Sequence, residues 1–334
     1  MVMVEFGINI NNREPLLVES YTVEKMMRLG AKAEDYGFDS VWVGDSLLDR
    51  PRLEPISLLG HLAAETDEID LGTGCMITPL RNPIQFLQAW NSMEMLSDGR
   101  MVLGACMGPP TPGCKEQYEV LGLDYRSRAT MLEEQLEIFK QFWREGELNY
   151  EGDVYEFRDV DFRRGPEIRD LAPVQEDPPI LVISNPAHHD SGSDDVINRA
   201  ARRIVELGDG WMAAGLGHAP DEYARQYQSI VDYANEHGHD PDDVHTTFQV
   251  TMTIDDDADA ADEKMAEYIK TYYPHLYEGK DPLEWGPSGD ADDLIEWIEE
   301  FHGHGCEEFI IRFGGEDQAG QMERFVDEVL PAFN

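Results

Sequence analysis

The stretch SVWVGDSLLDR, residues 40–50, contains side chains whose types and position could support chemistry. Its first four residues are typical of a buried strand, and the run stops at Gly44, Asp45 and Ser46. A carboxylate at a strand end can stabilise charge that develops during a transfer reaction, and a hydroxyl can donate or accept a hydrogen bond. The same acid can instead cap the loop or helix that follows, so both interpretations of Asp45 stay open.

The other predicted strands end in small residues rather than in acids or bases. These ends comprise Gly74, Cys75 and Met76; Gly104, Ala105, Cys106, Met107 and Gly108; Ser184, Asn185 and Pro186; Ala213, Ala214 and Gly215; and, in the last strand, Arg312. Clustered glycines let the backbone approach a flat or bulky group closely, which suits a ring cofactor held by main-chain groups. Tight packing of helices on strands is the alternative explanation for any single glycine.

Two further segments could contact a ligand. His188 and His189 follow the fifth predicted strand and could form a catalytic pair, a metal site or plain surface, although no carboxylate or cysteine spacing supports a metal. The string AAGLGH, residues 213–218, is a glycine-rich turn before a predicted helix. Exposed N–H groups of Gly215, Leu216 and Gly217 could hold a phosphate there without a basic side chain.

The elements that must position these residues alternate along the chain as eight strand–helix pairs. We expect strands at 4–10, 40–45, 69–77, 100–106, 178–184, 210–215, 245–254 and 307–313, and helices at 22–37, 55–66, 83–97, 128–145, 194–207, 219–236, 257–272 and 317–330. Strands joined by helical crossovers are parallel and covered on both faces, which matches the near-continuous apolar runs. This pattern predicts an α/β fold, one (β/α)₈ barrel domain over residues 1–334, with its site at the C-terminal strand ends.

An open doubly wound sheet is the alternative, but its first strand would be followed by a G-x-G-x-x-G turn, which is absent after residues 4–10. Three insertions interrupt the pattern: 109–127 after strand four, 146–177 before strand five and 273–290 after helix seven. The second contains LNYEGDVYEF, which predicts a hairpin outside the barrel.

Composition excludes several classes of protein. Acidic residues outnumber basic ones by 68 to 26, for a net charge of −42, so the chain lacks the basic stripe that nucleic-acid binding requires. An acid excess spread along a well-patterned chain indicates adaptation to high salt, in which repulsion is screened, and we expect a halophilic archaeal source. We find neither an apolar run of roughly 18 residues nor a signal-peptide pattern, and expect a cytoplasmic protein. Cys75, Cys106, Cys114 and Cys306 lack CxxC spacing and are expected to be free thiols.

The motifs GFDSVWVGDS, LGTGCMITPLRNP, LSDGRMVLGACMG and LGDGWMAAG, in this order, resemble the bacterial luciferase-like superfamily of flavin- and deazaflavin-dependent oxidoreductases. The similarity covers nearly the whole chain and includes the C-terminal EEFIIRFGGEDQAGQMERF; each motif is weak alone, and the ordered set is specific. The resemblance implies a (β/α)₈ barrel with an insertion before strand five. It also implies FMN, in monooxygenases fed reduced flavin by a partner reductase, or coenzyme F-420, a deazaflavin that passes hydride between C5 and a substrate.

The resemblance can be followed at single residues. In many deazaflavin members the second strand ends in Asp-His beside the ring, so Asp45 matches the acid and Ser46 replaces the histidine. Because a serine does not exchange a proton near neutral pH as a histidine does, the resemblance does not extend to proton transfer by residue 46. The Gly74–Cys75 bond matches the place where the family has a non-prolyl cis peptide behind the deazaflavin ring.

Two strand ends depart from the family pattern. Pro109 stands where the glucose-6-phosphate dehydrogenases of the family have a glutamate that serves as an acid, which argues against sugar phosphate oxidation by that route. After strand five, Ser184 and Asn185 replace the two glycines that family members often place against the cofactor.

We therefore interpret the sequence as that of an F-420-dependent oxidoreductase acting on a small organic substrate, in one version similar to methylenetetrahydromethanopterin reductases. An FMN-dependent monooxygenase is the alternative, and a non-catalytic flavin-binding protein is the second alternative. The expected catalytic residues are Asp45, Ser46 and His188. The expected cofactor contacts are Asp45, Gly74, Cys75, Met76, Gly104, Met107, Gly108, Ser184, Asn185, Gly215, Leu216 and Gly217, and no metal ligand is expected. A flavin or F-420 reductase and a second copy of the chain, as a dimer, are partners that the resemblance allows; nucleic acid and membranes are not expected partners.

Overall fold

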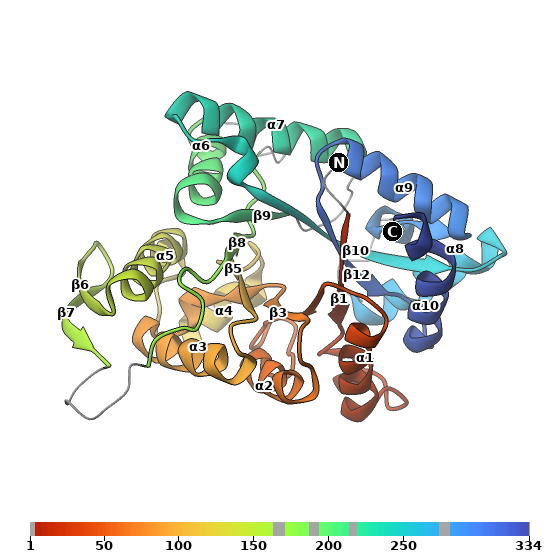
Figure 1. Cartoon of the computed structure of the whole chain (residues 1–334), viewed down its shortest axis with the longest axis horizontal. Helices are drawn as coiled ribbons and strands as arrows, with labels where there is room; N and C mark the ends of the chain where they lie inside the picture. Colours follow the sequence, from red (N-terminus) through yellow and green to blue (C-terminus); the bar gives the residue numbers. More distant parts are fainter. Residues whose placement is uncertain (1–3, 163–170, 187–193, 214–218, 274–280, 334) are drawn as a thin grey trace.

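A closed barrel of eight parallel strands forms the centre of the computed structural model, which describes residues 4–162, 171–186, 194–213, 219–273 and 281–333 (Figure 1). The barrel strands are β1 (Glu5–Ile10), β2 (Ser40–Val43), β3 (Asp70–Thr73), β5 (Met101–Cys106), β8 (Ile180–Val182), β9 (Gly210–Ala213), β10 (His245–Ile254) and β12 (Glu308–Phe313). The barrel closes because β12 pairs in parallel with both β1 and β10. The predicted (β/α)₈ barrel is confirmed, and the strands lie where the apolar runs placed them.

Helices surround the strands (Figure 1). They are α1 (Val23–Asp35), α2 (Pro55–Glu65), α3 (Pro83–Ser97), α4 (Pro112–Val120), α5 (Arg128–Glu145), α6 (Asp194–Arg202), α7 (Pro220–His237), α8 (Ala258–Tyr272), α9 (Ala291–Gly303) and α10 (Gln318–Arg324). Local sequence explains their starts: for example, the Asn82 side chain accepts hydrogen bonds from the backbone of Ile84 and Gln85, and Pro83 occupies the first turn of α3.

Two of these helices were not expected from the sequence. Helix α4 lies inside the insertion 109–127, where Thr111 caps it, and α9 follows the insertion 273–290. The start of α9 carries a detectable signal, because the side chains of Asp290 and Asp293 form a reciprocal capping box. Its apolar positions Leu294, Ile298 and Phe301 have helical spacing, but the acids between them obscured the pattern.

The lower part of the barrel interior is filled by one large side chain and its neighbours. Trp42 from β2 packs inside with Leu181, Met212 and Ile310, the interior residues of three other strands. Gly72 leaves the space that the Trp42 ring occupies, since a Cβ at that position would lie 2.2 Å from the ring. At the level of Trp42 the barrel interior is therefore a packed core. The candidate site lies above this layer, at the C-terminal ends of the strands.

The insertions lie outside the barrel sheet. Strands β6 (Glu147–Glu151) and β7 (Glu156–Asp161) form a separate antiparallel hairpin, as predicted for LNYEGDVYEF. The Glu134 carboxylate on α5 holds the hairpin turn by accepting backbone hydrogen bonds from residues 153–155. Two short strands, β4 (Met76–Ile77) and β11 (Ser288–Gly289), extend the pairing at β5 and β10.

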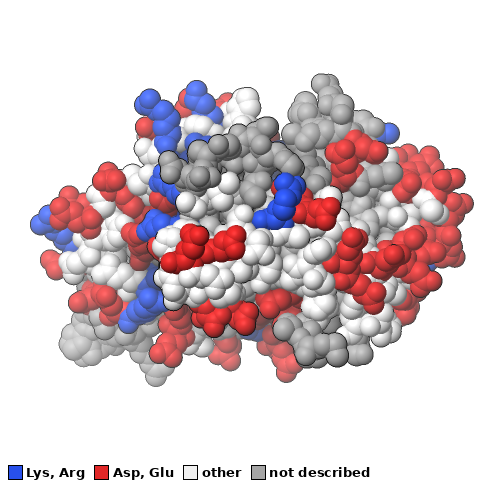
Figure 2. Space-filling model, turned by 90° about the horizontal axis from the view of Figure 1, so that it is seen from above, with Lys and Arg blue, Asp and Glu red and all other residues white. Residues whose placement is uncertain are grey.

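The acid excess is visible on the surface. Figure 2 shows acidic side chains spread over the face that it draws, with fewer basic ones among them. Among the helices in the described ranges, none combines the length and the apolar character needed to cross a membrane.

Candidate functional site

Asp45, directly after β2, is a buried member of an ion pair. Its carboxylate accepts hydrogen bonds from both Nη atoms of Arg81, at 2.5 and 3.1 Å, and from the backbone N–H of Ile77 at 3.0 Å. Its own backbone N–H donates to the carbonyl of Cys75, and only 6% of the Asp45 side chain is exposed. Arg81 also contacts Glu54 at 3.5 Å. Asp45 thus fastens the end of β2 to the segment that follows β3, a structural role that differs from the expected cap on the loop or helix after Asp45.

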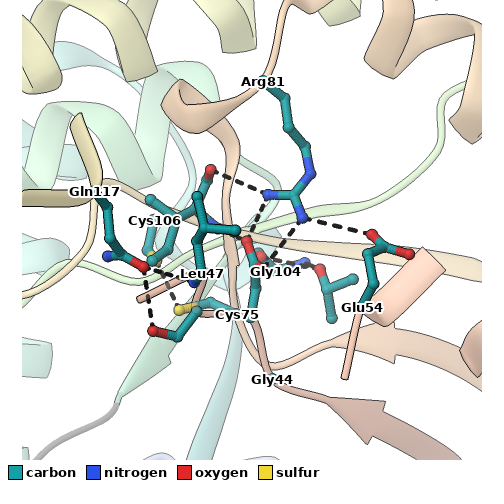
Figure 3. Close-up of polar contacts among 12 residues, drawn as sticks. Gly44, Leu47, Glu54, Cys75, Arg81, Gly104, Cys106 and Gln117 are labelled. Carbon is teal, nitrogen blue, oxygen red and sulfur yellow. Dashed lines mark hydrogen bonds and ion pairs between the residues drawn. The ribbon is translucent and has the colours of Figure 1, made fainter. Parts of the chain in front are cut away.

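Ser46 belongs to a turn that is held by one glutamine. The Ser46 hydroxyl donates to Gln117 Oε1 at 3.3 Å and accepts from the backbone N–H of Arg50 at 3.1 Å. The same Gln117 oxygen accepts from the backbone of Leu47 and Leu48 at 2.6 and 2.8 Å (Figure 3). Gln117 comes from α4, the helix that the sequence did not predict, and its fully buried side chain connects the β2 and β5 loops.

The end of β3 presents backbone toward the barrel interior. The Gly74–Cys75 peptide bond is cis, as the resemblance implied. The Gly74 carbonyl accepts a hydrogen bond from Gln249 Nε2 at 3.1 Å. A Cβ built on Gly74 would lie 3.2 Å from Gln249 Nε2 and 3.7 Å from Asn9 Nδ2, both of which are interior side chains. Gly74 therefore forms a side-chain-free edge above the Trp42 layer.

Packing also requires the glycines at the end of β5. A Cβ on Gly104 would lie 2.0 Å from the Thr73 carbonyl oxygen. Gly108 has a φ of +77°, and its Cβ would lie 2.6 Å from Cys114 Sγ. Close strand packing accounts for Gly104, and a tight turn accounts for Gly108.

Two thiols meet at this edge. Cys75 Sγ and Cys106 Sγ lie 2.7 Å apart, and all four cysteines of the chain are free, as predicted (Figure 3). The contact with Cys75, together with burial, raises the pKa of Cys106. Cys106 therefore presents a neutral, polarisable thiol at this edge.

The other predicted contacts fall into two groups. Met76 is fully buried, Met107 is half-buried with its carbonyl accepting from the Tyr118 hydroxyl, and the buried Ser184 accepts from Trp211 Nε1 through its carbonyl. Asn185 is half-buried. His188, His189, Gly215, Leu216 and Gly217 lie outside the described residues. Within the described ranges, no group of three or more His, Cys, Asp or Glu could hold a metal ion.

Arg128 is a candidate site residue that the sequence reasoning missed. It is the first residue of α5, and its guanidinium carbon lies 4.0 Å above the Tyr125 ring. Its Nε atom is buried without a hydrogen-bond partner in the described structure. Tyr125 packs edge-on against Tyr118, which bonds the Met107 carbonyl, so this cation is connected to the end of β5. A cation at a helix start, four residues beyond a polar Asp124, gives little sequence signal.

A second missed group lies on the other side of the barrel mouth. We name Arg13, Arg52, Arg312, Tyr272 and Tyr273 the arginine–tyrosine cluster. Its members come from the loop after β1, the loop after β2, strand β12 and the C-terminal end of α8 with the residue that follows it. Burial alone would raise the pKa of the Tyr273 phenol, but the nearby guanidinium groups of Arg312, Arg52 and Arg50 together lower it.

Comparison with known proteins agrees with this geometry. Residues 3–325 match the model of the family described as luciferase-like monooxygenase. A coenzyme F-420-dependent glucose-6-phosphate dehydrogenase of Amycolatopsis mediterranei is 23% identical over 94% of this chain and 95% of its own length.

Two solved structures share the fold. A monooxygenase from Streptomyces bottropensis superposes with a TM-score of 0.79 at 16% identity, over 99% of this chain and 100% of that one. The coenzyme F-420-dependent tetrahydromethanopterin reductase from Methanopyrus kandleri gives a TM-score of 0.77 at 20% identity, over 99% and 100% of the two chains. At these identities the likeness establishes the barrel and leaves the substrate open.

Proposed function

Because the chain belongs to the luciferase-like monooxygenase family, we propose that it is an oxidoreductase that binds coenzyme F-420 at the C-terminal mouth of its barrel. In this proposal it transfers a hydride between C5 of the deazaflavin and a small organic substrate. The observation that carries the proposal is the edge formed by Gly74 and Gly104, where backbone faces the barrel interior and Gln249 orients the Gly74 carbonyl. Such an edge accommodates a flat ring and leaves its reactive face to the substrate.

The described residues also fit the charged part of such a cofactor. Coenzyme F-420 and FMN both carry phosphate, and Arg128 supplies a cation with an unpaired buried N–H at the start of α5. A helix N-terminus and a guanidinium both favour an oxyanion. Arg128 would therefore hold the phosphate at the β5 side of the mouth. The turn with Gly215, Leu216 and Gly217 stays a prediction for the same role.

When bound, the coenzyme supplies the hydride chemistry, and the protein orients and desolvates it. Gly74 and Cys75 support one side of the ring position. The Asp45–Arg81 pair fixes the segment that carries Cys75 and Ile77, which makes Asp45 a positioning residue in this proposal. Its predicted catalytic role, and those of Ser46 and His188, stay predictions.

The finer parts of the interpretation also stay proposals. An FMN-dependent monooxygenase is the alternative function, favoured by the fold shared with the Streptomyces monooxygenase. A role similar to the tetrahydromethanopterin reductases is one version of the main proposal, supported by an equally extensive structural match. A reductase partner, a dimer, a cytoplasmic location and a halophilic source stay expectations from the sequence.

Titration of the purified protein with each cofactor tests the proposal. Coenzyme F-420 and FMN are added separately in about 2 M KCl, a concentration at which charge repulsion is screened, and ring fluorescence is followed. Tight binding of F-420 without FMN binding, together with F-420-dependent turnover, supports hydride transfer. Tight binding of FMN alone selects the monooxygenase. Binding of neither refutes the assignment.

A further inference from the structure

The arginine–tyrosine cluster concentrates positive charge at the barrel mouth. The guanidinium carbons of Arg13, Arg52 and Arg312 lie 5.6, 5.5 and 5.0 Å from the centre of the Tyr272 ring. Arg312 also lies 5.3 Å from the Tyr273 ring. Arg50, which is paired with Asp49 at 3.7 Å, lies 5.5 Å from the Tyr273 ring as well. Four cations thus share one pair of aromatic rings, in a chain whose net charge is −42.

Among the described residues, the groups that accept hydrogen bonds from Arg13, Arg52 and Arg312 are neutral. Arg312 donates through Nε and Nη2 to the Thr251 hydroxyl, at 3.1 and 2.8 Å, and through Nη1 to the Tyr273 hydroxyl at 2.8 Å. Arg52 donates to the Tyr272 hydroxyl and to Asn12 Oδ1.

Arg13 is the third guanidinium, and it donates to the Tyr272 carbonyl at 2.5 Å. Across the parts of the chain that the structure describes, no carboxylate oxygen lies within 4.0 Å of the side-chain nitrogens of Arg13, Arg52 or Arg312.

This pattern differs from that of other buried cations in the chain. Arg203 has the Glu133 carboxylate at 2.6 Å, and Lys140 has Asp209 at 2.7 Å. Arg100 lacks an ion pair, but its Nε, Nη1 and Nη2 atoms donate five hydrogen bonds, four of them in two pairs on the Nη atoms. Among the described residues, Arg52 and Arg312 make fewer hydrogen bonds than they have N–H groups, so each has donors that could bind a further partner.

Glu14 is a buried acid whose charge would interact with Arg312, and its anionic form is disfavoured. Burial raises the pKa of Glu14 to about 7, although Gln318 and Arg312 act in the opposite direction. Burial, together with the like charges of Arg52 and Arg50, lowers the pKa of Arg13. Burial would also lower the pKa of Arg52 and Arg312, but the neighbouring tyrosines raise both. Burying cations without a counter-ion is unfavourable unless a ligand supplies the missing charge.

The arginine–tyrosine cluster also lies close to the edge formed by Gly74, where the cofactor ring is proposed to bind. Arg312 follows Ile310 on the interior face of β12, and its partner Thr251 lies two residues beyond Gln249 on the same face of β10. Side chains two residues apart on a strand are separated by about 7 Å, so the cluster lies about one small molecule away from the Gly74 carbonyl. Arg52 approaches from the β2 side, since a Cβ on Gly44 would lie 3.2 Å from its guanidinium carbon.

We propose that Arg52 and Arg312 bind an oxyanion of the substrate, a carboxylate or a phosphate, and so place the substrate between the cluster and the cofactor ring. This inference rests on the proposed function and names its substrate class as small anionic molecules. A planar guanidinium offers two parallel N–H groups to two oxygens, which fixes the orientation of a substrate as well as its position. The cofactor phosphate is assigned instead to Arg128, on the β5 side.

Anion binding is tested without any cofactor. The thermal unfolding of the purified protein is followed while succinate or inorganic phosphate replaces KCl at constant ionic strength. We compare Arg52→Gln and Arg312→Gln with Arg28→Gln, which removes the same charge from a side chain that is 74% exposed and paired with Glu24. Saturable stabilisation of the wild type should weaken about tenfold or more in Arg52→Gln and remain in Arg28→Gln.

The outcomes decide the proposal even if Arg312→Gln fails to fold, because the half-buried Arg52 alone suffices for the comparison. No saturable binding in the wild type, or an equal loss in Arg28→Gln, overturns it. A second arm measures the binding of coenzyme F-420 and of its phosphate-free deazaflavin core to the wild type and to Arg52→Gln. A selective loss of F-420 affinity would assign the oxyanion to the cofactor and overturn the substrate assignment, whereas unchanged binding of both compounds supports it. If neither F-420 nor FMN binds the wild type, the proposed function fails while the anion measurement still stands.

Discussion

Replacing Asp45 by alanine separates an anchoring role of this residue from a catalytic one. The Asp45 side chain is 6% exposed and Arg81 is 22% exposed, so the substitution leaves a largely buried guanidinium without its main partner. Breaking a fully buried ion pair costs about 3 to 5 kcal/mol. Because Arg81 keeps some solvent contact and a second carboxylate, Glu54 at 3.5 Å, we expect a loss of about 2 to 3 kcal/mol.

The assay is equilibrium unfolding in denaturant, supported by thermal unfolding. With an unfolding entropy of about 2.1 cal/mol/K per residue, the expected loss lowers the melting temperature of this 334-residue chain by about 3 to 4 °C. Glu54→Gln is the matched control: it removes the exposed partner of Arg81 and should change the stability by less than about 1 kcal/mol. The double variant Asp45→Ala/Arg81→Met should lose less than the sum of the two single changes.

Asp45→Asn extends the test. An asparagine keeps an acceptor for the Ile77 N–H but loses the charge, so it should lie between the wild type and Asp45→Ala in stability. Asp45→Ala with unchanged stability and unchanged F-420 binding, but without turnover, would refute the anchoring argument and restore the acid as a catalytic residue.

Two further predictions concern the charge of the protein. Because the repulsion among 68 acidic residues is screened more strongly as salt increases, the melting temperature should rise between about 0.1 and about 2 M KCl, and equal values would mean that the acidity has another origin. At the opposite end of the barrel from the site, burial would lower the pKa of His245, but hydrogen bonds to Glu307 and Glu308 raise it to about 10. A raised histidine pKa stabilises the folded state fully below the unfolded value of about 6.5, and this contribution disappears as pH rises toward about 10. The stability difference between the wild type and His245→Gln should therefore shrink between about pH 6 and about pH 10, and a difference that stays constant over that range would contradict the assignment.

The barrel could be predicted because its information is local. Each buried strand appears as a short apolar run, and each crossover helix shows apolar residues at helical spacing. Eight repetitions of this strand–helix unit are compatible with few folds other than a (β/α)₈ barrel. The way in which the interior is filled is not local. Gly72 fits because Trp42 lies beside it on the neighbouring strand, and a sequence shows neither the pairing nor the space.

The two interpretations of Asp45 could not be separated from the sequence for the same reason. Its partner Arg81 lies 36 positions later, and Gln117, which orders the adjacent turn, lies about twice as far along on an unexpected helix. Arg312 was visible as a strand-end residue, but nothing in its surroundings along the chain indicated the tyrosines of α8 or the lack of a carboxylate partner. A site built by a closed barrel collects residues from all eight units, so its chemistry emerges only with the topology.

The net charge and the arginine–tyrosine cluster act on an anionic substrate over different distances. At low salt, a charge of −42 repels an anion many ångströms before contact, whereas at about 1 M salt the Debye length is only about 3 Å and the repulsion is largely removed. Arg312 is only 8% exposed and acts at hydrogen-bond distance, where a partly buried pair is screened much less. Salt should therefore raise the association rate of an anionic substrate more than it weakens the bound contact. An acidic surface and an anion-binding mouth are thus compatible in one chain, provided that it works in concentrated salt.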